Sequence, residues 1–306
     1  MSKIPWCDET WNVTAGCSKV SEGCLNCYAE RMAYRLAWMG QEKYIKVMDE
    51  HGDNDGWNGS VYCDESALDK PLHWKKPRRI FVCSMSDLFH PQVPFEFIDK
   101  VFAAMALCPQ HTFQVLTKRP DRLAGWANLP NQSLVITEAA RKIAKGRGPK
   151  LMNDAAVICW PLPNLHLGVS CENRKRADER IPILLQIPAA KKFVSFEPLL
   201  GEIELQEIRC GHCGCSVDMC YEAESSYCKS RPLHIDYIII GSESINGAAG
   251  RECKLEWVES LVEQAKASGV PCAVKQIHVN GKLLKYDKKN KAWPDAWPEN
   301  IRVWEI

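Results

Sequence analysis

The sequence lacks the features that mark membrane-spanning, secreted and strongly polyanion-binding proteins. No apolar run is long enough to cross a bilayer, and no basic leader is followed by an apolar segment, so we expect a soluble, cytoplasmic protein without a membrane partner. The formal net charge is only +1, which gives no overall attraction to nucleic acid. The chain also has no repeat of fixed period and no long low-complexity segment, which argues against a solenoid.

Cysteine, by contrast, is abundant and unevenly distributed. Of the 16 cysteines, three fall within residues 17–27 and five within residues 210–228. A disulfide framework would spread its cysteines along the chain, whereas clustered thiols are typical of metal sites in a reducing compartment. The 306 residues, 46% of them hydrophobic, suffice for one barrel-sized domain or for two ordinary domains.

Short apolar runs alternate with longer segments of helical period. This alternation, with nearly continuous apolar strands, predicts a parallel sheet covered by helices on both faces. The predicted strands are residues 10–15, 79–85, 112–118, 165–171, 192–198 and 236–244. The predicted helices are residues 28–39, 94–107, 173–185 and 255–268.

Polar residues gather at the C-terminal ends of these strands, where loops of a parallel βα fold converge on ligands. We therefore expect an α/β fold in which a partial (βα)6 TIM-like barrel places them around one mouth. The barrel would cover residues 1–278, with a basic, helical insert at 129–163 and a cysteine-rich, metal-binding insert at 209–233. Residues 279–306 would form a closing hairpin or capping tail.

The first cysteine group has the spacing C-x6-C-x2-C at Cys17, Cys24 and Cys27, with a glycine before each of the first two. A structural zinc site normally closes with four ligands, so zinc would require a fourth residue such as Cys7. A [4Fe-4S] cluster held by three cysteines leaves one iron without a protein ligand, which a reactive cluster requires. Both readings are open at this point, and the cluster is favoured.

A three-cysteine loop after the first strand of a βα barrel resembles the radical S-adenosylmethionine (SAM) superfamily. More closely, TWNVTAGCSKVSEGCLNCYAERMA at residues 10–33, followed by LTKRPDRL, LGVSCEN, FEPLLG, IIIGSES and LVEQAKASGVPCAVKQ, is similar to a phage-associated, three-cysteine radical-SAM-like family of unknown function. The similarity covers most of the chain outside the two inserts and the tail. The superfamily's commonest spacing is C-x3-C-x2-C with an aromatic residue before the third cysteine, whereas this chain has a longer gap and Asn26 there.

The resemblance implies a SAM site at the strand ends. Ser84, Ser86 and Asp87 would contact the amino group of SAM, and Lys118 or Arg119 its carboxylate, through charge-assisted bonds. The groups implied for the ribose and the far side of the site are Ser170, Glu172, Glu197, Ser242 and Glu243. A strand-end serine can instead cap the next helix, and Glu197 can bond the backbone of a turn.

The second cysteine group favours a structural zinc site that would hold together an insert too short for its own core. An auxiliary iron-sulfur cluster and unliganded thiols are the alternatives. The expected ligands are Cys210, Cys213, Cys220 and Cys228, with Cys215 as the alternate.

The resemblance implies an enzyme that reductively cleaves SAM to a 5'-deoxyadenosyl radical for hydrogen abstraction, using an electron donor such as flavodoxin or ferredoxin. The phage association and the basic segments at 75–79, 141–150 and 282–293 favour a nucleobase in DNA or a nucleotide as substrate. RNA or peptide substrates, a methylating enzyme, and a non-catalytic, zinc-dependent nucleic-acid-binding protein are the alternatives.

Overall fold

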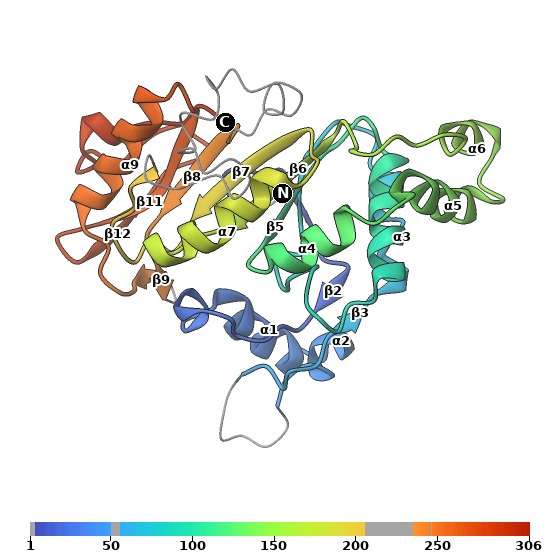
Figure 1. Ribbon diagram of the computed structural model, residues 1–306. Coiled ribbons are helices and arrows are strands. Elements are labelled where there is room, and N and C mark those ends of the chain that lie inside the picture. Colours follow the sequence, from blue (N-terminus) through green and yellow to red (C-terminus); the bar gives the residue numbers. More distant parts are fainter. Residues whose placement is uncertain (1–3, 50–55, 206–234, 246) are drawn as a thin grey trace. The chain divides into compact units, whose positions relative to one another are not determined.

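The computed structural model describes residues 4–49, 56–205, 235–245 and 247–306, which form a mixed α/β fold with a large, mostly parallel sheet (Figure 1). The chain divides into two compact units. The first unit comprises Met1–Val20, Cys27–Leu167 and Pro188–Ala190, and the second comprises Ser21–Asn26, Gly168–Ile187 and Lys191–Ile306. The three-cysteine segment thus contributes Cys17 and Cys27 to the first unit and Cys24 to the second.

Three parallel strands form the centre of the first unit, in the order β1 (Glu9–Trp11), β4 (Arg79–Val82) and β5 (Thr112–Thr117). β2 (Thr14–Ala15) leaves this sheet and pairs antiparallel with β3 (Tyr62–Cys63). The apolar residues of β4 and β5 are almost all buried, as expected for strands covered on both faces.

The helices of the first unit pack through a group of buried aromatic rings. The ring centroids of Phe102 and Trp126 are 4.2 Å apart, and Trp126 also lies 5.2 Å from Trp160. The Trp126 indole N–H donates to Asp99 Oδ1 at 2.8 Å, which satisfies the buried donor. The helices are α1 (Tyr28–Trp38), α2 (Glu42–Ile45), α3 (Phe95–Ala106), α4 (Pro120–Ala127), α5 (Gln132–Ala144) and α6 (Pro149–Asp154), with 3-10 turns η2 (Glu65–Ala67) and η3 (Lys70–His73).

The second unit is built on the parallel strands β7 (Lys191–Phe196), β8 (Tyr237–Gly241) and β11 (Cys272–Val279), followed by the antiparallel β12 (Lys282–Lys285). β6 (Leu165–Ser170) begins in the first unit and ends in the second. The remaining elements are α7 (Arg174–Gln186), α9 (Leu255–Ala267), η1 (Glu22–Cys24), η6 (Glu299–Ile301) and the short pair β9 (Ser244–Ile245) and β10 (Ala248–Ala249).

Most predicted elements are confirmed to within a few residues. The insert expected at 129–163 contains α5 and α6, and the tail expected at 279–306 contains β12, which pairs with β11. The parallel strand β11 was not predicted, and the first predicted strand is divided into β1 and β2. No closed barrel is found in the described part of the chain, and the partial barrel stays a prediction.

Two further expectations concern the cysteine-rich insert and the absence of a membrane-spanning helix. The cysteine-rich insert, with Cys210, Cys213, Cys215, Cys220 and Cys228, lies outside the described residues. Across the four described ranges, no helix combines the length and the apolar character needed to cross a membrane.

Gly168 in β6 marks a close approach between strands of the second unit. A Cβ atom at this position would lie 2.5 Å from the ring of Phe193 in β7, much closer than van der Waals contact permits. The Phe193 ring is stacked on Tyr237, with centroids 5.0 Å apart and planes inclined by 3°, so it has little freedom to move. Only glycine fits beneath this ring.

We expect Gly168→Ala to lower the free energy of unfolding by about 1–3 kcal/mol, because the added methyl group overpacks a buried ring. Gly125→Ala is the matched control, since Gly125 lies in α4 with no atom within 4 Å of the added Cβ. That control should be neutral or stabilising by up to about 1 kcal/mol. Urea unfolding curves measure both, and equal midpoints for the two variants would contradict the packing.

Candidate functional site

The first and third cysteines lie in the first unit and are residues of intermediate exposure. Gly16 precedes Cys17 with a φ of +88°, and a Cβ there would lie 2.2 Å from the carbonyl oxygen of Ser60, so only glycine fits. Burial, followed by the charge of Asp87, raises the pKa of Cys17 to about 12, while Arg119 acts in the opposite direction. Cys27 makes the smallest contribution of those that raise this pKa.

Asp87, which follows β4, accepts hydrogen bonds from four residues. Its carboxylate accepts from the Thr117 hydroxyl at 2.8 Å, from the Lys118 backbone N–H at 3.1 Å and from the Phe89 backbone N–H at 2.9 Å. Arg119 Nη1 completes the set at 2.9 Å. Because only 6% of Asp87 is exposed, these bonds replace the water that its charge would otherwise need.

Arg119 connects Asp87 to the cysteine segment. Its Nη1 also donates to Cys17 Sγ at 3.7 Å, and its Nη2 donates to the backbone oxygen and the hydroxyl of Ser18 at 2.8 and 3.0 Å. The Ser18 hydroxyl also pairs with His90 Nε2 at 2.8 Å. Arg119 was predicted to bind the carboxylate of SAM, and in this structure its guanidinium contacts Asp87 and residues 17–18.

The two serines that follow β4 bond to the segment that leads to Cys17. Ser86 Oγ donates to the Thr14 backbone oxygen at 3.0 Å, and Ser84 Oγ donates to Asn12 Oδ1 at 3.1 Å. Neither serine caps α3, since the N-cap of that helix is Pro94. The capping alternative therefore fails for both, and their contact with the amino group of SAM stays a prediction.

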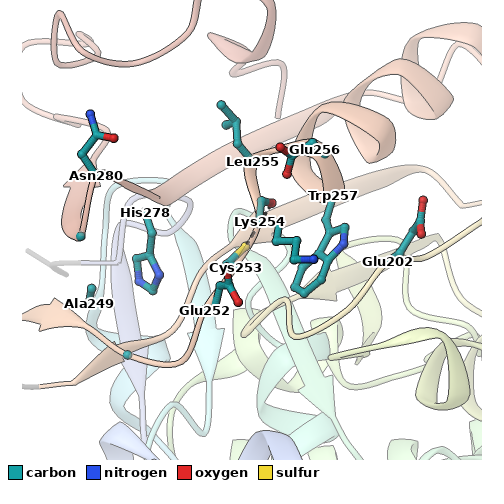
Figure 2. A pocket seen from close by; sticks show the side chains of 12 residues that line it. Glu202, Ala249, Glu252, Cys253, Lys254, Leu255, Glu256, Trp257, His278 and Asn280 are labelled. Atoms are coloured by element: carbon teal, nitrogen blue, oxygen red, sulfur yellow. Dashed lines mark hydrogen bonds between the residues drawn. The ribbon is translucent and has the colours of Figure 1, made fainter.

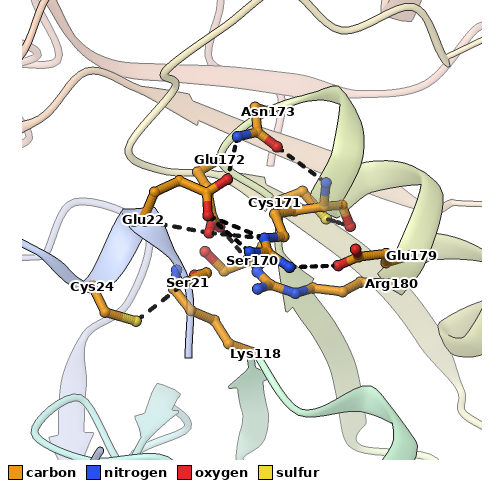
Figure 3. A network of polar contacts seen from close by, with 12 residues as sticks. Ser21, Glu22, Cys24, Lys118, Ser170, Cys171, Glu172, Asn173, Glu179 and Arg180 are labelled. Carbon is orange, nitrogen blue, oxygen red and sulfur yellow. Dashed lines mark hydrogen bonds and ion pairs between the residues drawn. The ribbon is translucent and has the colours of Figure 1, made fainter. Parts of the chain in front are cut away.

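In the second unit, the segment that carries Cys24 is fixed at three successive points, and Figure 3 shows the surroundings of Glu22 and Glu172. Glu22 Oε2 accepts from Arg176 Nη2 at 2.9 Å, and this bond is the main cause that lowers the pKa of Glu22 to about 2. The Gly23 N–H donates to Glu172 Oε1 at 3.3 Å, and Asn26 Nδ2 donates to Glu243 Oε2 at 3.0 Å. The neighbours of Cys24 are thus bonded to two predicted site residues, Gly23 through its backbone and Asn26 through its side chain.

Glu172, Glu197 and Glu243 follow β6, β7 and β8, and each faces a cation within the second unit. The ion-pair distances are 2.9 Å from Glu172 to Arg180, 3.0 Å from Glu197 to Lys275 and 2.5 Å from Glu243 to Arg251. The Lys275 pairing shows that the Glu197 side chain does more than bond the backbone of a turn. Contact of all three carboxylates with SAM stays a prediction.

A glycine makes room for each of these carboxylates. A Cβ would lie 2.9 Å from the Glu172 side chain at Gly23, 2.3 Å from Glu197 at Gly241 and 2.6 Å from Glu243 at Gly250. Since none of these glycines has a positive φ, close approach to the carboxylate is what requires them.

The two predicted serines of the second unit contact backbone groups. Ser170 Oγ donates to the Glu197 backbone oxygen at 3.0 Å, and Ser242 Oγ donates to that of Gln276 at 3.4 Å. Ser242 does not cap α9, whose N-cap is Lys254.

A pocket of about 850 Å³ lies in the second unit beside β11 and the N-terminus of α9 (Figure 2). Trp257 and His278 line it, and His278 Nε2 bonds the Glu243 backbone oxygen at 2.8 Å. Through Glu243 the pocket wall is thus connected to Asn26, which lies between Cys24 and Cys27 in the chain. Its volume suits a ligand of the size of a nucleoside or a few amino-acid residues.

The charged residues of the pocket rim are mainly acidic. Glu202, Glu252 and Glu256 are exposed there, and Lys254 is the cation among the lining residues, with its Nζ 5.5 Å from the centroid of the Trp257 ring. This balance favours a ligand that carries positive charge over one that carries phosphate groups.

Several of these residues were not predicted from the sequence. They are Arg176, Arg180, Arg251 and His278. The available signal was the pairing of two of the three strand-end glutamates with an arginine eight residues later, at Glu172 with Arg180 and Glu243 with Arg251.

We expect Glu243→Gln to reduce the free energy of unfolding at pH 7 by about 1–3 kcal/mol, because it weakens charge-assisted bonds to Arg251 and Asn26. Burial raises the pKa of Glu243, but those bonds outweigh it and lower the pKa from 4.5 to about 2. The carboxylate therefore contributes fully above about pH 4.5 and loses its contribution as the pH falls toward 2.

Urea unfolding at a series of pH values measures this effect, and the difference between wild type and Glu243→Gln should shrink on acidification. Glu263→Gln, which changes an exposed carboxylate on the same unit's α9, is the control and should stay within about 0.5 kcal/mol of wild type. A difference that is constant from pH 7 to pH 3 would contradict the assignment.

Among the described residues, no group of three or more His, Cys, Asp and Glu side chains is arranged to hold a metal ion.

Comparison with known proteins identifies the family of this chain. Neither the curated proteins nor the solved structures include a match to this chain. A family model described as "Protein of unknown function (DUF5131)" matches residues 1–293, so the chain belongs to the DUF5131 family.

Proposed function

We propose that the protein is a radical SAM enzyme whose [4Fe-4S] cluster is held by Cys17, Cys24 and Cys27. The observation that carries this proposal is that charged groups hold the cysteine segment within each unit. Arg119 contacts Cys17 in the first unit, and Glu172 and Glu243 bond the neighbours of Cys24 in the second. Partial barrel architecture, in the radical SAM form, belongs to the same proposal.

The chemistry of the three donors suits such a cluster. Three soft thiol ligands suit iron-sulfur chemistry, and all three side chains are partly exposed. Cys24 and Cys27 are three residues apart, so their Cα atoms can be separated by at most about 11 Å. Cys7, the residue considered as a fourth zinc ligand, is fully buried, and its thiol donates to the Ile4 backbone oxygen at 3.9 Å.

A bound cluster would supply the electron for reductive cleavage of SAM to methionine and a 5'-deoxyadenosyl radical, which would abstract a substrate hydrogen. The chain's own residues bind and orient SAM. We assign the amino group to Ser84 and Ser86, and the carboxylate to Lys118, because Arg119 already contacts Asp87, Cys17 and Ser18. Ser170 and Glu172 are assigned to the ribose, and Glu197, Ser242 and Glu243 to the far side.

Two observations bear on the substrate. Exposed basic residues of α5, α6 and the turn between them, namely Lys142, Lys145, Arg147 and Lys150, favour a nucleobase in DNA or a nucleotide. The acidic rim of the Trp257 pocket instead favours a peptide with a cationic side chain as the second candidate. In either case, the pocket's task is to exclude water and to place one C–H bond against the radical.

The cysteine-rich insert is proposed to hold structural zinc, or an auxiliary cluster. A zinc protein without catalysis, in which both cysteine groups are structural and nucleic acid is the partner, is the rival from another class. This alternative requires a zinc ion with four ligands at the first cysteine group, which has three cysteines.

We expect Cys24→Ala to reduce 5'-deoxyadenosine formation from SAM and dithionite to the background without enzyme, because it removes one of three ligands. Cys159→Ala is the matched control, since Cys159 is exposed and lies outside the three-cysteine segment. Anaerobic reconstitution, iron and sulfide analysis and mass spectrometry of the nucleoside product measure the effect. Cleavage that is unchanged in Cys24→Ala, or a colourless wild type with zinc at both groups, would defeat the proposal.

A further inference from the structure

Arg119 is held beside Cys17 so firmly that its position is a fixed feature of the site. Its side chain is 9% exposed, and its two terminal nitrogens donate to Asp87, to both oxygens of Ser18 and to the Cys17 sulfur. Asp87 is held in turn by Thr117 and the backbone of Lys118. The guanidinium therefore cannot turn away to meet water without leaving a buried carboxylate unpaired.

A fixed cation next to a ligating sulfur has a definite electrostatic consequence. Adding an electron to an iron-sulfur cluster increases its negative charge, and a nearby cation that also donates an N–H bond to the sulfur stabilises the added charge. Burial of the Arg119 side chain strengthens this stabilisation, because little water is present to screen the guanidinium charge. Asp87, which is also buried near Cys17, acts with the opposite sign.

We propose that Arg119 is a positioning residue that raises the reduction potential of the cluster bound through Cys17, and that Asp87 limits this increase. The inference rests on the proposed function, since it requires a cluster at the three cysteines. It assigns to Arg119 control over how readily the site accepts its electron, in place of contact with the carboxylate of SAM.

A purely structural role gives a different pattern. If Arg119 only tethers Ser18, its loss lowers the amount of cluster that the protein retains, and the clusters that remain keep the wild-type potential. Electrostatic control instead changes the potential of clusters that are fully assembled, and it gives opposite signs for Arg119 and Asp87.

The test is a redox titration, followed by electron paramagnetic resonance, of reconstituted protein without SAM. We expect Arg119→Met to shift the reduction equilibrium at least tenfold toward the oxidised cluster, which is about 59 mV more negative for a one-electron couple. Arg119→Lys retains the charge and should fall between the wild type and Arg119→Met. Asp87→Asn removes a negative charge, keeps an oxygen acceptor and should shift the potential in the positive direction.

Arg122→Met is the matched control. Arg122 lies three residues farther along, donates to the Val93 backbone oxygen and stacks on the Phe95 ring at 4.6 Å, so its loss should leave the potential unchanged. Iron and sulfide content is measured for every sample, and potentials are compared only for fully loaded protein.

The outcomes separate the inference from the function on which it rests. A wild type that assembles no [4Fe-4S] cluster overturns the proposed function. A wild type that assembles the cluster, with Arg119→Met at the same potential or with Asp87→Asn shifted in the same direction as Arg119→Met, overturns the inference alone.

Discussion

Burial of charge is the constraint on which the candidate site depends. Asp87, Glu172 and Glu243 are each less than 10% exposed, and an unpaired carboxylate in such surroundings costs several kcal/mol. Each carboxylate is therefore paired with an arginine. The arginine beside Asp87 also contacts Cys17, while Glu172 and Glu243 themselves bond the neighbours of Cys24. The need to satisfy these charges thus helps to position the residues around Cys17 and Cys24.

The same constraint explains where glycine is required. Gly23, Gly241 and Gly250 leave space for carboxylates, and Gly16 allows the chain to pass close to Ser60 just before Cys17. These positions link the local backbone to the chemistry, because a side chain at any of them would displace a charged group or the first cysteine. In the account proposed here, the structure positions the thiols and their charged neighbours, and the cofactors supply the reaction.

Much of the fold could be predicted from sequence, because apolar runs of strand length indicate strands of a sheet that is covered on both faces. The parallel strand β11 was missed, since the polar residues Lys275, Gln276 and His278 interrupt its apolar pattern. Those residues are polar because they contact Glu197, Ser242 and Glu243. Sequence also identified Asp87 and Glu172 as candidates, but their partners could not be found. Gly23 and Glu172, for example, are 149 residues apart, and no local pattern connects them.

The central claim is that three thiols hold a cluster with one iron open to SAM. Electron paramagnetic resonance of anaerobically reconstituted, reduced protein tests it most directly, with spectra recorded before and after SAM is added. The account predicts the signal of a reduced [4Fe-4S] cluster whose g values change when SAM binds. A colourless protein with one zinc ion at the three cysteines, or a cluster signal that SAM leaves unaltered, would contradict it.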